Sequence, residues 1–425
     1  MSISNDAAKG TAPFLAYAHS FQAVTRPGLS RIGALCTALG NPERTLSCIH
    51  VAGTNGKGSV CAFLTASLMA AGKRVGTFTS PNLVRTSERI RVNGAEIPEE
   101  EMNAILTEMA PLCDQMKREI GERPTQFELW TAAAFVWFAR CSCEIVVLET
   151  GMGGAFDATN IISHNVAAVF TRIDLDHTEY LGTTHEEIAA TKAGIMKSTC
   201  ETMTAFSVLQ EPSCETVLAR EAKAHGLTFT AVPPLPSVGR EGFFECVMLG
   251  KTRVTLGIGG AYQRENAALA VAVLRKLGID DSAIAKGLAA ARHKGRMEVL
   301  RQKPLLLYDG AHNPNGVRAL LAAFDKAAPT LRPAVIFACM KDKEIAPSLT
   351  LLSSRASRFI FTTVQGNSRA EDAQTLRKRA SRLGIEGASA DTLTDALAML
   401  AADEDALICG TLYLYADLDA ALSER

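Results

Sequence analysis

Apolar residues recur at two different spacings along the first half of the chain. Residues 46–52 form a mostly apolar run, which predicts a buried strand. Residues 59–71 place apolar side chains three or four positions apart and stop before Gly72, which predicts a helix with one buried face. Three more strands are predicted at residues 74–79, 145–148 and 166–171. Strands that alternate with helices in this way are typical of an α/β fold with a mainly parallel sheet.

The second half repeats this alternation after an irregular stretch. Residues 233–260 are rich in turn-forming residues, residues 266–277 predict a helix, and residues 291–299 have the character of a hinge or linker. Later strands are predicted at residues 304–308, 334–338, 358–363 and 406–409. We therefore expect an N-terminal domain over residues 1–292 and a smaller, Rossmann-like α/β C-terminal domain over residues 293–425. One continuous large sheet without a hinge is the alternative.

Composition narrows the class of protein. The 425 residues contain 44 Lys and Arg against 45 Asp and Glu, a net charge of −1, with 47% hydrophobic and 21% charged residues. This balance is ordinary for globular proteins, and it argues against a disordered chain and against a basic protein that binds nucleic acid. The sequence has no heptad stripe, so we expect a monomer.

The cysteines and the length of the apolar runs indicate where in the cell the protein is expected to be. The 11 cysteines are scattered, and no second Cys/His pair completes a zinc site, so we expect reduced and buried thiols. No run approaches the roughly eighteen apolar residues of a membrane span. Residues 1–10 lack the basic-then-apolar order of a signal peptide. We therefore expect a cytoplasmic protein with no membrane partner.

A glycine-rich segment separates the first predicted strand from the helix that follows it. It consists of Gly53, Thr54, Asn55, Gly56, Lys57, Gly58 and Ser59. Its glycines let the backbone turn tightly and aim N–H groups at an anion, and the helix dipole adds to the attraction. Lys57 can reach terminal phosphates and Ser59 can ligate Mg²⁺. We predict a P-loop-type ATPase domain. Because Gly58 breaks the strict Walker A spacing, a glycine-rich turn with a solvated lysine is the alternative.

Polar residues stand at or just beyond other predicted strands. Glu149 ends a strand where open α/β sheets bind ligands, and its carboxylate suits Mg²⁺; a turn residue without a ligand is the alternative. Asp309 ends a strand of the second domain, where it suits a ribose hydroxyl or a metal-bound water. His177 could bind metal or orient a phosphate, but a lone histidine is more often structural. Lys192 lies on a predicted helix and by itself has the character of a solvated charge.

Five ordered motifs make the chain resemble a known family. They are residues 53–59, 149–160, 176–177, 192–194 and 309–314. They recur in this order in the folylpolyglutamate synthases and dihydrofolate synthases of the Mur ligase superfamily. The resemblance is to the bacterial bifunctional type and extends over nearly the whole chain. It implies ATP-dependent ligation of L-glutamate to dihydropteroate, and to tetrahydrofolate or folylpolyglutamate, through an acyl phosphate.

The resemblance also implies roles for the matching residues. The catalytic set would be Lys57, Glu149, His177 and Lys192. Ser80 and Glu149 would hold one Mg²⁺ and His177 a second, while a carbamate formed on Lys192 with CO₂ would supply a further oxygen ligand. The nucleotide contacts, besides residues 53–59, would be Asn266, Arg296 and Asp309. The pterin pocket would comprise Arg26, Pro27, Gly28, Leu29, Thr125, Gln126, Phe127, Phe156, Asp157 and Ala158.

Two departures from the family pattern bear on the site. His293 and Lys294 precede Gly-Arg at the hinge, where the family usually has a Pro, often after an aromatic residue or Leu. Asp174 adds a carboxylate near His177, which either interacts with the metals or accepts hydrogen bonds.

Four other readings of the motifs stay open. Within the superfamily they are a monofunctional folylpolyglutamate synthase and a cell-wall Mur ligase, although the residues before Gly53 leave no room for the UDP-binding domain expected of the latter. Outside it they are a P-loop ATPase without ligase activity and a non-catalytic folate-binding protein.

Overall fold

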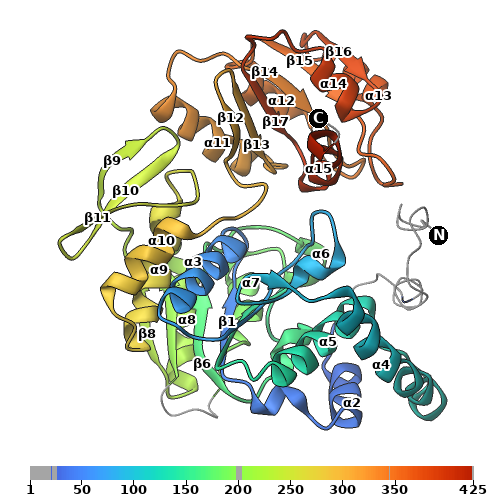
Figure 1. The fold of residues 1–425 in the computed structure, drawn as a ribbon, viewed down its shortest axis with the longest axis vertical. Coiled ribbons are helices and arrows are strands. Elements are labelled where there is room, and N and C mark those ends of the chain that lie inside the picture. Colours follow the sequence, from blue (N-terminus) through green and yellow to red (C-terminus); the bar gives the residue numbers. More distant parts are fainter. Residues whose placement is uncertain (1–20, 22–25, 198–202, 344, 424–425) are drawn as a thin grey trace.

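The computed structural model describes residue 21 and residues 26–197, 203–343 and 345–423. The first ten residues, in which no signal peptide is expected, lie outside these ranges. The described chain forms two large sheets and one small one (Figure 1). The first large sheet ends at Val232 and the second begins at Glu298, so the alternative of one continuous sheet is wrong. The domain boundary between residues 292 and 293 stays a prediction.

The first sheet has eight strands in the order β4-β3-β2-β5-β1-β6-β7-β8. They are β1 (Cys48–Ala52), β2 (Val75–Phe78), β3 (Ile90–Val92), β4 (Ala95–Glu96), β5 (Ile145–Glu149), β6 (Asn165–Phe170), β7 (Thr204–Val208) and β8 (Thr228–Val232). The central strand β1 pairs in parallel with β5 and β6, which places Val51 level with Glu149 on one side and Val169 on the other. Strands β3 and β4 run antiparallel at one edge. The predicted mainly parallel sheet is confirmed.

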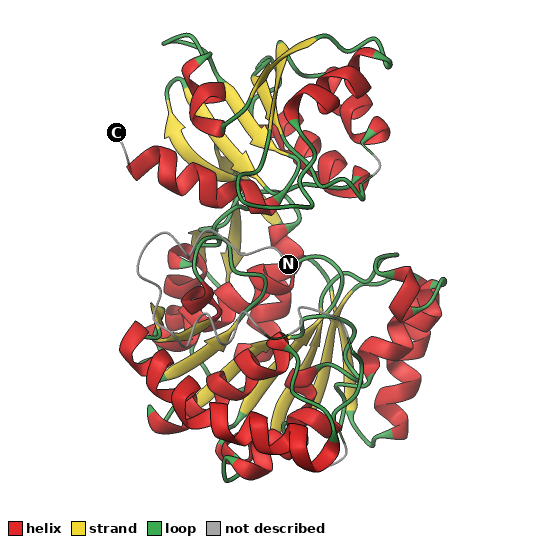
Figure 2. Ribbon diagram, turned by 90° about the vertical axis from the view of Figure 1, so that its right-hand side faces the viewer, coloured by secondary structure: helices red, strands yellow, loops and turns green. Residues whose placement is uncertain are grey.

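Helices cover both faces of this sheet (Figure 2). They are α2 (Ser30–Ala38), α3 (Lys57–Ala70), α4 (Glu99–Ile120), α5 (Gln126–Arg140), α6 (Thr178–Leu181), α7 (His185–Ala193), α8 (Pro212–Ala224), α9 (Gln263–Lys276) and α10 (Asp281–Ala290). Successive side chains of a strand point to opposite faces. Ile49 and Val51 of β1 therefore pack with α3, α9 and α10, whereas Cys48 packs with α2, α4 and α5 and Ala52 with α7 and α8. Among the described residues, no helix combines the length and the apolar character needed to cross a bilayer.

The second sheet has six strands in the order β12-β13-β17-β14-β15-β16. They are β12 (Glu298–Gln302), β13 (Leu305–Asp309), β14 (Ala334–Phe337), β15 (Arg358–Thr362), β16 (Gly387–Ala390) and β17 (Ala406–Cys409). The helices around it are α11 (Pro314–Ala327), α12 (Ala346–Ser353), α13 (Ala373–Ser381), α14 (Leu393–Ala398) and α15 (Tyr415–Ser423). Apart from β12 the strands pair in parallel, as the predicted Rossmann-like fold requires. Asp309 stands at the carboxyl end of β13.

A small antiparallel sheet lies beside the junction of the two large ones (Figure 1). It consists of β9 (Ser237–Glu241), β10 (Phe244–Leu249) and β11 (Thr252–Thr255), in the region predicted to be rich in turns. Phe243, between β9 and β10, packs edge-on against Phe324 of α11 with ring centroids 5.0 Å apart. This contact joins the first part of the chain to the second.

Helix α3, which begins within the glycine-rich segment, is held by a close contact with α10. A Cβ atom at Gly287 of α10 would lie 2.2 Å from the Ser67 Cα atom of α3, so a glycine is needed for the two helices to approach this closely. Ser67 Oγ also donates a hydrogen bond to the Ile284 carbonyl oxygen at 3.5 Å. The packing of α3 on α10 therefore sets where the N-terminus of α3 lies.

We expect Gly287→Ala to lower the free energy of unfolding by about 1–3 kcal/mol, because the added methyl group must push α3 and α10 apart. Equilibrium urea unfolding measures this change. Ser282→Ala, at an exposed position on the same helix, is the matched control and should change the value by less than about 0.5 kcal/mol. Equal stability of the two variants would contradict the close helix contact.

Candidate active site

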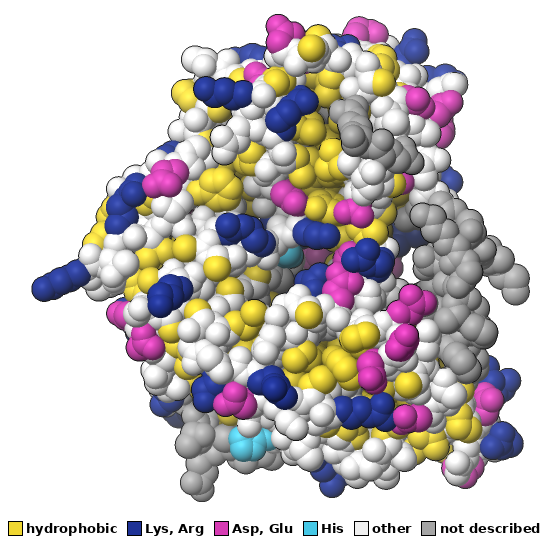
Figure 3. Space-filling view, viewed as in Figure 1, with side chains coloured by type: hydrophobic (Ala, Val, Ile, Leu, Met, Phe, Trp, Pro, Cys, Tyr) yellow, Lys and Arg dark blue, Asp and Glu magenta, His cyan; other side chains and the backbone are white. Residues whose placement is uncertain are grey.

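A cavity of about 1810 Å³ lies between the two large sheets. The first part of the chain lines it with residues 54–59, Glu149 and His177, and the second part with Asp309 and His312. Lys and Arg side chains gather at the surface in this region between the two large sheets (Figure 3). The carboxyl ends of parallel strands from both sheets thus open onto one space, where open α/β sheets bind their ligands.

The glycine-rich segment joins β1 to α3 and needs its glycines. A Cβ atom at Gly53, where φ is 151°, would lie 1.9 Å from Thr171 Oγ1. A Cβ atom at Gly56, where φ is 96°, would lie 2.5 Å from Asn266 Oδ1. Lys57 is the first residue of α3, so the free amides of the first helical turn face the cavity as an anion site. The alternative of an ordinary glycine-rich turn does not explain this placement.

Two lysine side chains converge on the Gly53 carbonyl oxygen. Lys57 Nζ donates to it at 3.1 Å and to the Thr54 carbonyl oxygen at 3.4 Å. Lys192 Nζ donates to the same Gly53 oxygen at 3.0 Å. Lys192 is only 3% exposed, and burial together with the nearby Lys57 charge lowers its pKa to about 7. The expectation of a solvated charge, drawn from Lys192 alone, is therefore wrong: α7 carries this lysine into the interior.

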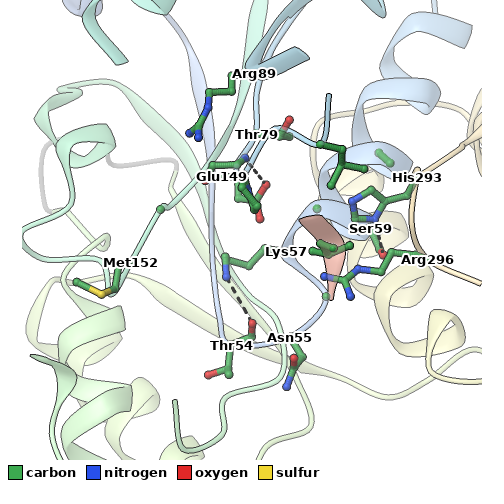
Figure 4. Close-up of a pocket in the computed structure, with 18 of the residues that line it drawn as sticks. Thr54, Asn55, Lys57, Ser59, Thr79, Arg89, Glu149, Met152, His293 and Arg296 are labelled. Atoms are coloured by element: carbon green, nitrogen blue, oxygen red, sulfur yellow. Dashed lines mark hydrogen bonds between the residues drawn. The ribbon is translucent and has the colours of Figure 1, made fainter. Parts of the chain in front are cut away.

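Glu149 projects from the end of β5 toward Lys57 (Figure 4). The backbone N–H of Ser80 donates to its Oε2 atom at 3.1 Å. Burial raises the pKa of the Glu149 carboxyl, and the Lys57 charge opposes this shift. Arg89, whose role the sequence did not indicate, lies on the other side of Glu149 and lines the same cavity. Glu149 is therefore a cavity carboxylate rather than an ordinary turn residue.

The carboxylate of Glu149 can take part in a metal site but does not form one by itself. Within the described ranges, no three His, Cys, Asp or Glu side chains come close enough to hold a metal ion. Mg²⁺ at a phosphate site uses one or two carboxylates and completes its shell with phosphate oxygens and water. Glu149, with Ser80 beside it, fits this donor set.

His177 stands at the rim of the same cavity. It immediately precedes α6, as its N-cap residue with a φ of 50°, and its side chain is 55% exposed. Its Nε2 atom lies 3.8 Å from Asp176 Oδ2. The ring is therefore free to turn toward a ligand, and its assignment to a second metal stays a prediction.

Three predicted nucleotide contacts line the cavity from separate elements. Asn266 comes from α9, Arg296 from the linker and Asp309 from β13. Asp309 accepts hydrogen bonds from the Met297 N–H at 2.8 Å and the Ala311 N–H at 2.9 Å. Burial raises the pKa of the Asp309 carboxyl, and the Arg296 charge opposes this shift. The structure thus brings Arg296 of the linker and Asp309 of β13 close enough for their charges to interact.

The linker also contacts the glycine-rich segment directly. His293 Nδ1 lies 3.1 Å from Ser59 Oγ (Figure 4). Gln263 Nε2 donates to the same hydroxyl at 3.2 Å. Lys294 places its ammonium group 5.6 Å from the centre of the Tyr415 ring. The two residues that replace the usual linker pattern therefore tie the linker to both sides of the cavity.

Asp174 forms a second link across the cavity. Its backbone N–H donates to Thr54 Oγ1 at 3.0 Å, and its Oδ2 atom accepts from Asn315 Nδ2 of α11 at 2.8 Å. His185 Nε2 lies 3.5 Å from its other carboxylate oxygen. Of the two roles left open for Asp174, the contacts favour acceptance of hydrogen bonds.

Most of the residues predicted to bind a pterin line the same cavity. The ring centroids of Phe127, on α5, and Phe78 lie 5.8 Å apart. Phe127 packs against the core and also lines the cavity, so it has both structural and binding character. Phe156 is 62% exposed. The cavity-lining members of this set are Arg26, Pro27, Thr125, Gln126, Phe127, Phe156, Asp157 and Ala158. Gly28 and Leu29 follow Arg26 and Pro27 outside the lining, and the Gly28 N–H donates to the Phe156 carbonyl oxygen at 3.5 Å.

Two family descriptions match the chain. The Mur ligase middle domain matches residues 51–274, and the Mur ligase, glutamate ligase domain matches residues 295–411. The chain is 35% identical to the dihydrofolate synthase/folylpolyglutamate synthase of Bacillus subtilis, over 92% of this chain and 94% of that protein. It is 32% identical to the protein of the same name from Escherichia coli, over 99% and 97% of the two chains.

Solved structures of similar proteins agree with these matches. The folylpolyglutamate synthase of Thermotoga maritima superimposes with a TM-score of 0.86 at 28% identity, over 97% of this chain and 96% of that chain. The Mycobacterium tuberculosis folylpolyglutamate synthase complexed with ADP gives 0.88 at 29% identity, over 97% and 98%. An Escherichia coli protein in complex with DHPP and ADP gives 0.83 at 30% identity, over 98% and 99%.

The lowered pKa of the buried Lys192 predicts that the stability of the protein depends on pH. Its pKa is about 7 in the folded chain and about 10.4 when exposed, so the unfolded chain binds one more proton between these values. The stability of the protein should therefore rise with pH in this window, by at most about 1.4 kcal/mol per pH unit. Lys192→Met should be the more stable form near pH 7, and its advantage should shrink toward pH 10. Urea unfolding of both forms in CO₂-free buffer at several pH values measures this, and an advantage that is constant with pH would contradict the lowered pKa.

Proposed function

Because this chain belongs to the dihydrofolate synthase/folylpolyglutamate synthase family of Mur ligases, we propose that it is an ATP-dependent, amide-forming ligase with two acceptor substrates. It joins L-glutamate to dihydropteroate, and to tetrahydrofolate or folylpolyglutamate. ATP is the co-substrate and Mg²⁺ the cofactor, with two ions bound. The enzyme acts as a monomer in the cytoplasm, with residues 1–292 and 293–425 as its two domains and with neither nucleic acid nor membrane as a partner.

The observation that carries this proposal is the composition of one cavity. Its lining includes the anion site at the start of α3, the carboxylate of Glu149 and the aromatic segments around Phe127 and Asp157. A phosphate donor and a flat aromatic acceptor can therefore lie in one space. Arg296 reaches that space from the linker and Asp309 from beyond it, which suits a nucleotide held between two domains.

The chemistry requires a carboxylate to become an electrophile. The γ-phosphoryl group of ATP passes to the acceptor's carboxylate to give an acyl phosphate, and the amine of glutamate then displaces phosphate through a tetrahedral intermediate. Lys57, at the first turn of α3, would exchange its carbonyl partners for the oxygens of the moving phosphoryl group. Mg²⁺, held by Ser80 and Glu149 and by His177 with the Lys192 carbamate, would neutralise phosphate charge. The residues that span the cavity would position the reactants and exclude water.

Lys192 is proposed to carry the carbamate. Without the carbamate, its side chain shares the Gly53 carbonyl oxygen with Lys57, and two ammonium groups at this spacing repel each other. Its pKa of about 7 leaves a substantial neutral fraction at neutral pH, which is the form that attacks CO₂. Attack forms an N–C bond and releases one proton, and the product is an anion that attracts Lys57 and can ligate a cation.

We expect wild-type enzyme equilibrated with ¹³C-bicarbonate to show a carbamate carbon signal by NMR that Lys192→Ala lacks. Lys192→Ala should lose ligation by roughly 100-fold or more, since the loss leaves phosphate charge underneutralised, and added acetate should restore part of it. The exposed Lys223→Ala of α8 is the control and should keep both signal and activity. A fully active wild type without the ¹³C signal would remove the carbamate from the mechanism.

Two acceptors at one phosphoryl-transfer centre need different pterin positions. The reactive carboxylate of dihydropteroate lies on p-aminobenzoate, whereas that of a folate lies one glutamate further out. The pterin must therefore sit at different depths, or in different pockets, along the cavity. Phe127 offers an aromatic face for stacking, and Asp157 offers acceptors for pterin N–H groups.

The test of the proposed function is ADP release by purified enzyme, with glutamate and Mg²⁺ in every reaction. Dihydropteroate and tetrahydrofolate should each stimulate release by at least about tenfold over enzyme without acceptor, and each should inhibit turnover of the other because both use one ATP site. Stimulation by tetrahydrofolate alone would reduce the function to folylpolyglutamate synthesis. ADP release that needs no acceptor would indicate a P-loop ATPase instead, and stimulation by a UDP-muramyl substrate a cell-wall ligase.

A further inference from the structure

A buried chain of hydrogen bonds leads from the central strand of the first sheet to Asp157. His50 of β1 has no exposed surface, and its Nε2 atom lies 2.7 Å from Thr159 Oγ1. Thr159 is also fully buried, and its hydroxyl donates to Asp157 Oδ1 at 2.6 Å. Asp157 is 7% exposed and lines the cavity. These hydrogen bonds therefore connect the interior of the sheet to the part of the cavity lining around Asp157.

The donor of each hydrogen bond between His50, Thr159 and Asp157 can be assigned. A hydroxyl has one proton, and Thr159 gives it to Asp157, so Thr159 Oγ1 must accept its other hydrogen bond from His50. His50 therefore carries its proton on Nε2. Its Nδ1 atom is buried and has no hydrogen-bond partner among the described residues. Burial, with a smaller contribution from the Lys197 charge, lowers the pKa of His50 to about 3, which agrees with a neutral ring.

This arrangement makes Asp157 an acceptor. Its Oδ1 atom accepts from the Thr159 hydroxyl and, at 3.0 Å, from the Thr159 N–H, while its Oδ2 atom accepts from the Met152 N–H at 2.8 Å. Burial raises the pKa of the Asp157 carboxyl, and these donors oppose that shift by stabilising the ionised form. These three donors use both lone pairs of Oδ1 and one of Oδ2, so Oδ2 is the oxygen that can accept a further N–H group, and Asp157 lines the cavity.

We propose that His50 and Thr159 are positioning residues that hold Asp157 as an acceptor for an N–H group of the substrate's pterin ring. The inference rests on the proposed function, which supplies the pterin. Neither residue lines the cavity, so both act through Asp157. A pterin ring carries N–H donors at its edge, and a carboxylate oxygen fixed in one orientation is matched to a donor there. His50 thus determines substrate affinity from inside the sheet.

The rival explanation is structural. Asp157 also caps the short helix at Ala158–Ile161, and in this explanation the hydrogen bonds serve only to shape that turn. Under this explanation, loss of the Thr159 hydroxyl lowers stability and weakens nucleotide and pterin binding alike. Under the proposal, the loss acts on the pterin alone.

The experiment compares two disruptive and two conservative variants in the full-length protein. Thr159→Val and His50→Leu remove a hydrogen bond, whereas Thr159→Ser keeps the hydroxyl and His50→Gln keeps an N–H near the Nε2 position. Thr362→Val is the matched control, because Thr362 is a fully buried threonine of β15 in the other large sheet. Titration calorimetry gives the Kd for dihydropteroate and for ADP, steady-state ADP release gives kcat and KM, and thermal unfolding gives the Tm.

We expect Thr159→Val and His50→Leu to weaken dihydropteroate binding by roughly tenfold or more, as the loss of a hydrogen bond in a chain to a charged group predicts. KM for dihydropteroate should rise in parallel, while kcat and the Kd for ADP stay within about twofold. Thr159→Ser and His50→Gln should recover most of the affinity, and Thr362→Val should match wild type.

Two results would overturn the inference and leave the proposed function standing. One is unchanged dihydropteroate binding by both disruptive variants. The other is a parallel loss of pterin and ADP affinity that follows the Tm, which is the structural explanation. A wild-type enzyme that binds ADP but not dihydropteroate would instead overturn the proposed acceptor, and this inference with it.

Discussion

The Gly53 carbonyl oxygen is the point on which the site depends, because two lysine side chains from distant parts of the chain meet there. Lys57 arrives from the start of α3 and Lys192 from α7. Gly53 itself has no room for a side chain, because a Cβ atom there would collide with Thr171. Two lysine side chains held at one oxygen, in a buried place, form a site that an anion can complete. Burial and the Lys57 charge lower the pKa of Lys192, and the same Lys57 charge opposes the rise in the pKa of Glu149.

Contacts across the cavity link this anion site to the second sheet. His293 reaches Ser59 from the linker, and Asn315 of α11 reaches Asp174, which is itself bonded to Thr54. Each of these contacts ends on the glycine-rich segment or on its direct neighbour. A change in the relative position of the two sheets must therefore alter the contacts of the segment where phosphate is proposed to bind. This is the physical route by which closure around a nucleotide could assemble the site.

Two parts of the cavity lining are built by different means. The anion site and Asp309 stand at the carboxyl ends of strands, so the sheets fix them directly. Phe156 and Asp157 lie on a loop, and a loop needs additional support to hold a side chain in one orientation. Thr159 of the short helix at Ala158–Ile161 and His50 of the first sheet supply that support through hydrogen bonds. A rigid site for phosphate and a supported loop for the ring suit a ligase whose acceptors differ in length.

The spacing of apolar and polar residues was enough to predict the α/β fold and the position of the glycine-rich segment, because buried strands and amphipathic helices are local features of a sequence. Glu149 and Asp309 could be selected for the same reason. The family followed from the resemblance of five ordered motifs. Tertiary structure alone decided the surroundings of Lys192, whose partner Gly53 lies 139 residues away, and the tie between Asp174 and Asn315, 141 residues apart. It also decided that His50 and Thr159, 109 residues apart, share a hydrogen bond with no access to solvent. Burial and pKa depend on which distant segments pack together, and no local pattern carries that information.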